Sequence, residues 1–188
     1  MMTYLDIDKV QKAKAGFSFD YGPLLDQLLA RVPVNGLAVE LGCFLGCSTA
    51  YIAQFFKQRQ QAVRFITCDT FQGYAAANQF YFETLNNLKA CGVRDNVHVV
   101  TARSWDLADL FDSQEVDFVW VDAAHDYPSV QHDLEAWLPK LKSAHCIAGH
   151  DYSETGVKRA VDEMAAEHNL RVQVYNPAGW QSWFFNSA

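Results

Sequence analysis

Two hydrophobic patterns alternate along the chain. Short apolar runs have the length and the β-branched character of buried strands, whereas longer stretches carry an apolar residue every three or four positions, as amphipathic helices do. The five strand-like runs are Leu37–Leu41, Phe65–Cys68, Val97–Val100, Phe118–Val121 and Cys146–Ala148. Strands and helices in regular alternation predict an α/β domain whose parallel sheet is covered on both faces.

The helical pattern is clearest between the fourth and fifth strand-like runs. A helix over Pro128–Leu141 suits the proline, because the N–H group that proline lacks has no partner in a first helical turn. The apolar stripe of this helix contains Val130, Leu134, Trp137, Leu138 and Leu141. A second helix is predicted over Thr155–His168, with Thr155 as its N-cap. A third, around Leu24–Leu29, precedes the first strand.

The pattern changes near the C-terminus. The strand-like segments 172–175 and 183–185 are separated by a turn that contains Pro177 and Gly179, so they predict an antiparallel hairpin. The chain shows no internal repeat and no linker. We therefore expect one domain over residues 1–188, in which an N-terminal helical arm (1–35) precedes the core (36–188).

The composition is that of a folded acidic protein. Half of the residues are apolar, which excludes intrinsic disorder. The 15 Lys and Arg residues against 22 Asp and Glu give a net charge of −7, which disfavours nucleic acid as a partner. The apolar runs are too short to span a membrane, the first residues lack an apolar signal-peptide core, and the five cysteines are scattered. We therefore expect a cytoplasmic protein with no nucleic-acid or membrane partner.

The segment after the first strand has the sequence Gly-Cys-Phe-Leu-Gly-Cys-Ser over residues 42–48. Gly42 allows a sharp turn, and Gly46 permits close backbone approach where the next helix begins. This pattern predicts a cofactor at the carboxyl edge of the sheet, against free backbone N–H groups of the turn. The alternative is a glycine-rich turn that binds no ligand.

Two polar residues end the next strands in sequence. Asp69 ends the second strand, where a carboxylate can bind both hydroxyls of an adenosine ribose or cap a helix. Ser104 follows the third strand and is a candidate either for a helix cap or for an adenine contact. The chain contains no G-x-G turn, no Tyr-x-x-x-Lys pair and no G-x-x-x-x-G-K-[ST] loop, which disfavours hydride and phosphoryl transfer.

The segment Glu40-Leu-Gly42-x-x-x-Gly46-x-Ser48 resembles the first motif of class I S-adenosylmethionine-dependent methyltransferases. The similarity is greatest to the catechol O-methyltransferase-like group and to a family of short bacterial small-molecule methyltransferases. It extends from about residue 36 to the C-terminus and includes the segments 121–127 and 149–152. The resemblance implies a Rossmann-like, doubly wound sheet of seven strands in the order 3-2-1-4-5-7-6, with strand 7 antiparallel.

The same resemblance assigns residues to S-adenosylmethionine, which carries a sulfonium and an ammonium group. Glu40 and the turn from Gly42 to Gly46, followed by Ser48, would bind its methionine end. Asp69 would bind the ribose. The adenine would lie beside Ser104 or Trp105, although Trp105 is also a candidate for the core.

A second group of polar residues follows the fourth and fifth strands. The resemblance places Asp122, His150 and Asp151 where catechol-type enzymes bind Mg²⁺, with His150 in place of an acid. A nitrogen ligand favours Mn²⁺, Fe²⁺ or Zn²⁺ over Mg²⁺. His125 occupies the position of the catechol-type base and, with Asp122, is the catalytic candidate, since imidazole is a suitable base near neutral pH. The alternative is that both histidines only bind loop backbone.

These residues predict an enzyme that methylates a hydroxyl of a small molecule, with or without a divalent metal. With no insertion long enough for a lid, the pocket is expected to be shallow or completed by a second subunit of a homodimer. Two alternatives stay open: a cofactor-binding partner subunit without turnover, and a metal-dependent, hydroxylase-like oxidoreductase on the same scaffold.

Overall fold

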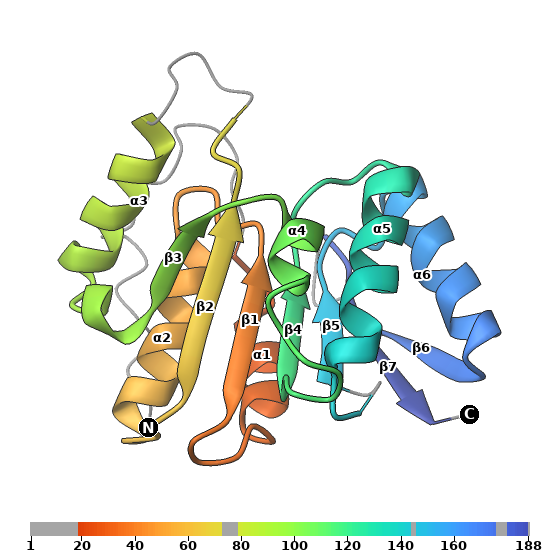
Figure 1. The fold of residues 1–188 in the computed structure, drawn as a ribbon, viewed down its shortest axis with the longest axis horizontal. Helices are drawn as coiled ribbons and strands as arrows, with labels where there is room; N and C mark the ends of the chain where they lie inside the picture. The colour runs from red at the N-terminus through yellow and green to blue at the C-terminus, as the bar shows by residue number, and fades with distance from the viewer. Residues whose placement is uncertain (1–18, 73–78, 144–145, 176–179, 188) are drawn as a thin grey trace.

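The computed structural model describes residues 19–72, 79–143, 146–175 and 180–187, and the strands in these ranges form one seven-stranded sheet (Figure 1). The strands are β1 (Leu37–Leu41), β2 (Arg64–Asp69), β3 (His98–Thr101), β4 (Phe118–Val121), β5 (Ile147–Gly149), β6 (Leu170–Tyr175) and β7 (Ser182–Ser187). Their order is β3-β2-β1-β4-β5-β7-β6. Strands β1 to β5 pair in parallel, and β7 runs antiparallel to both of its neighbours. The expected order and the reversed final strand are confirmed.

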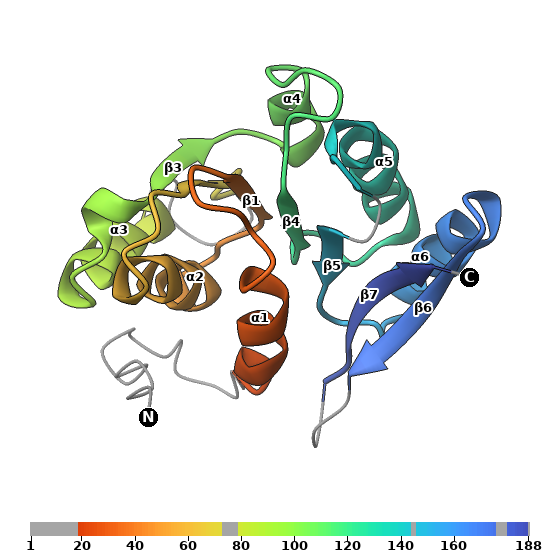
Figure 2. The ribbon, with the colours of Figure 1, turned by 90° about the horizontal axis from the view of Figure 1, so that it is seen from below.

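Helices cover the two faces of the sheet (Figure 2). On one face lie α1 (Gly22–Leu29), α2 (Cys47–Gln58) and α3 (Gln79–Ala90); on the other lie α4 (Ser104–Ala108), α5 (Tyr127–Trp137) and α6 (Thr155–Glu167). Short 3₁₀ turns occur at Arg94–Asn96 and Leu138–Lys140. Each face has its own apolar core, because successive side chains of a strand point to opposite faces. In β1, for example, Ala38 packs on the α2 side and Val39 on the α5 side.

The helix boundaries agree with the sequence pattern except at their ends. Helix α5 begins at Tyr127 with Pro128 in its first turn, as predicted, but its α-helical part ends at Trp137. The predicted Thr155 N-cap is wrong by one residue: α6 begins at Thr155, and Glu154 occupies the N-cap position without a capping side-chain hydrogen bond. No described helix has the length and apolar character that crossing a membrane requires.

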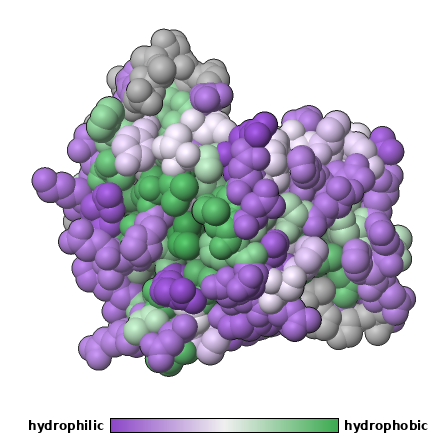
Figure 3. Space-filling view, in the orientation of Figure 1, coloured by the Kyte–Doolittle hydropathy of each residue, from purple (hydrophilic) through white to green (hydrophobic). Residues whose placement is uncertain are grey.

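The face with α4, α5 and α6 is covered unevenly. Helix α4 has only five residues, and Figure 3 shows apolar side chains gathered on this face between α3 and α4. Ile66 of β2 and Val100 of β3 are only partly buried there. The short helix therefore leaves part of the sheet without a helical cover, and its own position depends on contacts with α5.

Candidate active site

The candidate residues meet at the carboxyl ends of the parallel strands. The register pairs Leu41 of β1 with Cys68 of β2 and with Val121 of β4, and Val121 with Gly149 of β5. The residues at or just beyond these ends therefore share one edge of the sheet. This is the edge at which open α/β sheets bind ligands.

Glu40 is wholly buried beneath this edge. Its Oε2 atom accepts hydrogen bonds from the hydroxyls of Thr49 (2.5 Å) and Thr67 (2.6 Å). Burial raises the pKa of Glu40 to about 7, against the effect of the hydroxyls of Ser48, Thr49 and Thr67, which favour its charged form. Its Oε1 atom has no hydrogen-bond partner among the described residues. The carboxyl group can therefore accept a hydrogen bond from a cationic ligand.

The turn after β1 requires glycine at two positions for different reasons. Gly42 has a φ of +84°, and a Cβ atom there would lie 2.2 Å from the carbonyl oxygen of Asp122. Gly46, with a φ of +83°, is the N-cap residue of α2, and a Cβ atom there would meet Thr84 at 3.1 Å. Only the first position brings two backbone segments into direct contact, so Gly42 is the stricter requirement.

Asp69 is bound to this turn rather than left open to solvent. Its Oδ2 atom accepts the backbone N–H groups of Cys43 (3.1 Å) and Phe44 (2.9 Å), and its Oδ1 atom accepts that of Phe71 (2.8 Å). Two backbone N–H groups of the turn, which were expected to be free for a cofactor, are therefore bound by Asp69. A carboxylate has about four lone-pair sites, so Asp69 retains capacity for about one further hydrogen bond.

Ser104 and Trp105 form the first turn of α4. The Ser104 side chain is neither a helix cap, since Arg103 is the N-cap residue, nor free, because its hydroxyl donates to Asp133 of α5. Its oxygen still has lone pairs that can accept a hydrogen bond. The Trp105 ring is partly exposed and stacks on His132, with the ring centroids 4.6 Å apart. Trp105 thus lies at the surface of the edge rather than in the core.

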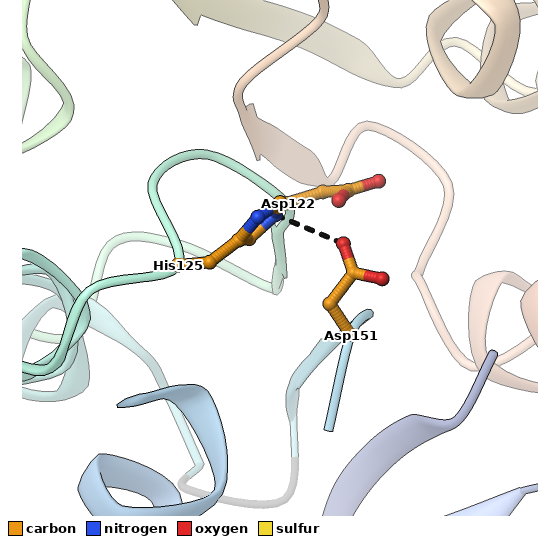
Figure 4. Close-up of side chains that lie close together, drawn as sticks. All are labelled: Asp122, His125 and Asp151. Carbon is orange, nitrogen blue, oxygen red and sulfur yellow. Dashed lines mark ion pairs between the residues drawn. The ribbon is translucent and has the colours of Figure 1, made fainter. Parts of the chain in front are cut away.

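A cluster of acids and histidines follows β4 and β5 (Figure 4). One ligand atom from each of Asp122, His125 and Asp151 lies within 4.8 Å of the other two, and His125 Nε2 is 2.9 Å from Asp151 Oδ2. His150 lies against the same carboxylates, with its Nδ1 atom 3.2 Å from Asp151 Oδ1 and 3.9 Å from Asp122 Oδ1. Both histidines therefore reach the two acids.

The two acids of this cluster differ in charge compensation. Burial raises the pKa of Asp122 to about 6. The charge of His150 acts to lower this pKa, but its effect is smaller than that of burial. Burial also acts to raise the pKa of Asp151, but hydrogen bonds to His125 and His150 outweigh it and lower that pKa well below its usual range. The hydrogen bond to Asp151 in turn raises the pKa of His125. Asp151 is also held at a φ of +54°, a strained conformation of the kind that clusters at functional sites.

Tyr21 belongs to the same site, although no sequence motif predicts it there. The ring lies just before α1, is 1% exposed, and has its centroid 4.4 Å from that of His150 and 5.2 Å from that of Trp120. Its hydroxyl is 3.5 Å from Asp122 Oδ2. Tyr21 therefore closes the cluster from the α1 side.

Residues 39–152 match the model of a protein family described as a methyltransferase domain, which is more than half of the chain. The chain belongs to this family. It is an S-adenosylmethionine-dependent methyltransferase, as the resemblance of Glu40–Ser48 implied, and its sheet has the Rossmann-like strand order of that class. No curated protein sequence matches this methyltransferase.

Solved structures of methyltransferases share the fold at low sequence identity. An S-adenosylmethionine-dependent O-methyltransferase from Thermotoga maritima superposes with a TM-score of 0.71 at 14% identity, over 96% of this chain and 70% of the other. The O-methyltransferase NovP gives 0.67 at 18%, over 89% and 80%. CalS11, a TDP-rhamnose 3'-O-methyltransferase of calicheamicin biosynthesis, gives 0.67 at 14%, over 87% and 77%.

Proposed function

We propose that this methyltransferase transfers the methyl group to a hydroxyl oxygen of a small molecule. The cluster of Asp122, His125 and Asp151 carries the proposal, because it supplies a proton acceptor at the same sheet edge as the glycine turn. The names of the Thermotoga maritima enzyme and of NovP support oxygen as the acceptor atom. The net charge of −7 favours a small molecule over nucleic acid.

The described residues fit the cofactor. Glu40 would bind the ammonium group through Oε1, which has no other partner, and Gly42 to Ser48 would surround the methionine end. Asp69 would accept one ribose hydroxyl, and Ser104 and Trp105 would lie beside the adenine. When bound, the cofactor supplies an electrophilic methyl group, and the protein has to orient the acceptor and remove its proton.

His125 would remove that proton. Its Nε2 atom faces Asp151 at 2.9 Å, so a neutral imidazole that donates Nε2–H to Asp151 leaves Nδ1 as the base. Asp151 orients the ring and stabilises the imidazolium, which raises the pKa of His125 above its ordinary value. A base of this kind contributes roughly 10²- to 10⁴-fold to the rate.

The same cluster fits a divalent metal as a second part of the proposal. Asp122 is half-buried and carries a raised pKa, and its contacts with the Tyr21 hydroxyl (3.5 Å) and with His150 Nδ1 (3.9 Å) are long, so the histidines compensate its charge only in part. Asp122 and Asp151, with either His125 or His150, would hold the ion, and the mixed oxygen and nitrogen set suits Mn²⁺ or Fe²⁺ better than Mg²⁺. A bound ion would supply Lewis-acid activation of the acceptor hydroxyl.

Detection of S-adenosylhomocysteine by mass spectrometry tests the proposal. The protein would be incubated with S-adenosylmethionine and phenols, catechols or sugar nucleotides such as TDP-rhamnose. His125→Ala should slow transfer by roughly 10²- to 10⁴-fold without changing cofactor affinity. His168→Ala, at the exposed C-terminal end of α6, is the control.

Two outcomes limit the proposal. Full activity in the presence of a chelator would exclude the metal. Tight cofactor binding without product from any hydroxyl acceptor would instead favour the partner-subunit alternative.

One observation favours a second candidate function. Asp151 lies between two histidines, with nitrogen atoms at 2.9 Å (His125) and 3.2 Å (His150) from its oxygens. Two histidines and one carboxylate are also the ligands of non-haem Fe²⁺ oxygenases. Oxygen consumption that requires Fe²⁺ and no S-adenosylmethionine would support an oxidoreductase, and its absence would leave methyl transfer as the function.

A further inference from the structure

A buried acid outside the acid–histidine cluster lies in the middle of α5. Asp133 is 1% exposed and shares the buried face of this helix with Val130, Leu134 and Trp137. Its Oδ2 atom has no hydrogen-bond partner among the described residues. Burial raises the pKa of Asp133 to about 7, and the charge of Asp126 acts in the same direction, whereas the Ser104 hydroxyl opposes them. An apolar residue would pack here without that desolvation penalty, so the acid requires an explanation.

Asp133, His132 and Trp137 of α5 each contact the first turn of α4. The Ser104 hydroxyl donates to Asp133 Oδ1, and the Ser104 carbonyl accepts the indole N–H of Trp137 at 3.1 Å. His132, the residue before Asp133, stacks on Trp105. Helix α4 has five residues and no capping side-chain hydrogen bond of its own. Three side chains of α5 therefore determine where Ser104 and Trp105 lie.

Asp133 is also close to the end of β2. Burial raises the pKa of Cys68, the residue immediately before Asp69, and the charge of Asp133 adds to this effect. The Asp133 carboxyl group is therefore near the end of β2, which carries the candidate ribose residue, and it binds Ser104, the candidate adenine residue that follows β3. Within the described residues, Asp133 makes its hydrogen bond with Ser104, and its pKa is shifted by burial, Ser104 and Asp126 rather than by a residue of the acid–histidine cluster.

We propose that Asp133 is a positioning residue for the nucleoside end of the cofactor, acting through Ser104 on the first turn of α4. This inference rests on the proposed placement of the adenine beside Ser104 and Trp105. It assigns Asp133 no contact with the reacting atoms. Asp133 should therefore affect cofactor binding and leave the chemical step unchanged.

Two substitutions separate the hydrogen bond from the charge. Asp133→Asn keeps an oxygen that can accept from Ser104 but cannot ionise, whereas Asp133→Leu removes the acceptor and fills the space with an apolar side chain. Ser104→Ala removes the donor and leaves the acid in place. Glu135→Gln, at an exposed position of the same helix, is the matched control.

Calorimetry with S-adenosylhomocysteine and steady-state kinetics test the inference on the full chain. Asp133→Leu and Ser104→Ala should each raise the Kd for S-adenosylhomocysteine and the KM for S-adenosylmethionine roughly tenfold. This is the effect expected when one hydrogen bond worth about 1.4 kcal/mol is lost. The kcat of Asp133→Leu should be unchanged. Asp133→Asn should restore binding to within about threefold of wild type, and Glu135→Gln should match wild type.

Each other result has a definite meaning. Wild-type affinity in Asp133→Leu would overturn the inference and leave the proposed function intact, whatever the affinity of Ser104→Ala. A fall in kcat with unchanged KM would also overturn it. If Asp133→Leu does not fold, Asp133→Ala, which also removes the acceptor, takes its place with the same expected result. A wild-type protein that binds neither form of the cofactor would overturn the proposed function and this inference together.

Discussion

The wholly buried Glu40 predicts an unusual dependence of stability on pH. Its pKa rises from 4.5 to about 7 on folding because burial disfavours the charged carboxylate. Between these two values the native state binds a proton that the unfolded state has lost. The contribution of Glu40 to the free energy of unfolding should therefore be fully present below pH 4.5, fall as pH rises towards 7, and be lost above 7.

The size of this effect follows from the pKa difference. One proton changes the unfolding free energy by about 1.4 kcal/mol per pH unit, so Glu40 alone accounts for about 3 kcal/mol between pH 4.5 and 7. Asp133, with its pKa raised to about 7, and Asp122, raised to about 6, act in the same direction because both are buried. The raised pKa values of His125 and His150 make the free energy of unfolding fall further as pH rises above 6.5. Asp151, whose pKa is lowered, affects stability only in stronger acid.

Urea unfolding at half-unit steps from pH 5 to pH 8 measures the slope. Glu40→Gln keeps an acceptor oxygen for Thr49 and Thr67 but cannot ionise, so its curve should be flatter by about 1.4 kcal/mol per pH unit below pH 7. Glu135→Gln, an exposed acid, should leave the slope unchanged. Parallel curves for wild type and Glu40→Gln would show that Glu40 is charged in the native protein and would refute the reasoning.

Three further predictions follow from the site. Gly42→Ala should destabilise the protein by at least about 3 kcal/mol in urea unfolding, because its Cβ would clash with backbone; a cost under 1 kcal/mol would contradict this. Tyr21→Ala should cost about 3–5 kcal/mol and Tyr21→Phe less than about 1 kcal/mol, since the ring is buried and its hydroxyl contact is long. Asp69→Ala should raise the Kd for S-adenosylhomocysteine by tenfold or more and also lower the melting temperature, because the carboxylate organises the turn; unchanged affinity would remove Asp69 from the site.

The sheet was predictable from the sequence because its central strands are buried on both faces. Such strands read as continuous apolar runs, and the predicted Leu37–Leu41 and Phe118–Val121 match β1 and β4 to the residue. The predicted fifth strand, Cys146–Ala148, is displaced by one residue from β5. Its last residue is Gly149, which has no side chain to extend an apolar pattern.

The contacts of the site residues were less predictable, because they depend on elements far apart in the sequence. The pattern identified Asp69 as an acid at a strand end, but only the structure shows that it binds Cys43 and Phe44 of the preceding turn. Asp133 reads as a polar residue beside the apolar stripe of α5, and its burial arises from the short α4 packed against it. Tyr21 lies just before α1 and belongs to no sequence motif, so its place in the site was not predictable.

Glu40 and Asp122 together suit a cationic cofactor. Each is an acid whose pKa is raised by burial, and Glu40 keeps an oxygen without a partner among the described residues. Folding alone would favour apolar residues in their place. A ligand with an ammonium and a sulfonium group brings positive charge to these two acids, so cofactor binding would compensate part of the desolvation that folding leaves uncompensated. The same residues that lower the free energy of unfolding near neutral pH would therefore raise the affinity for the cofactor. Such a loss of stability in favour of function is common at binding sites.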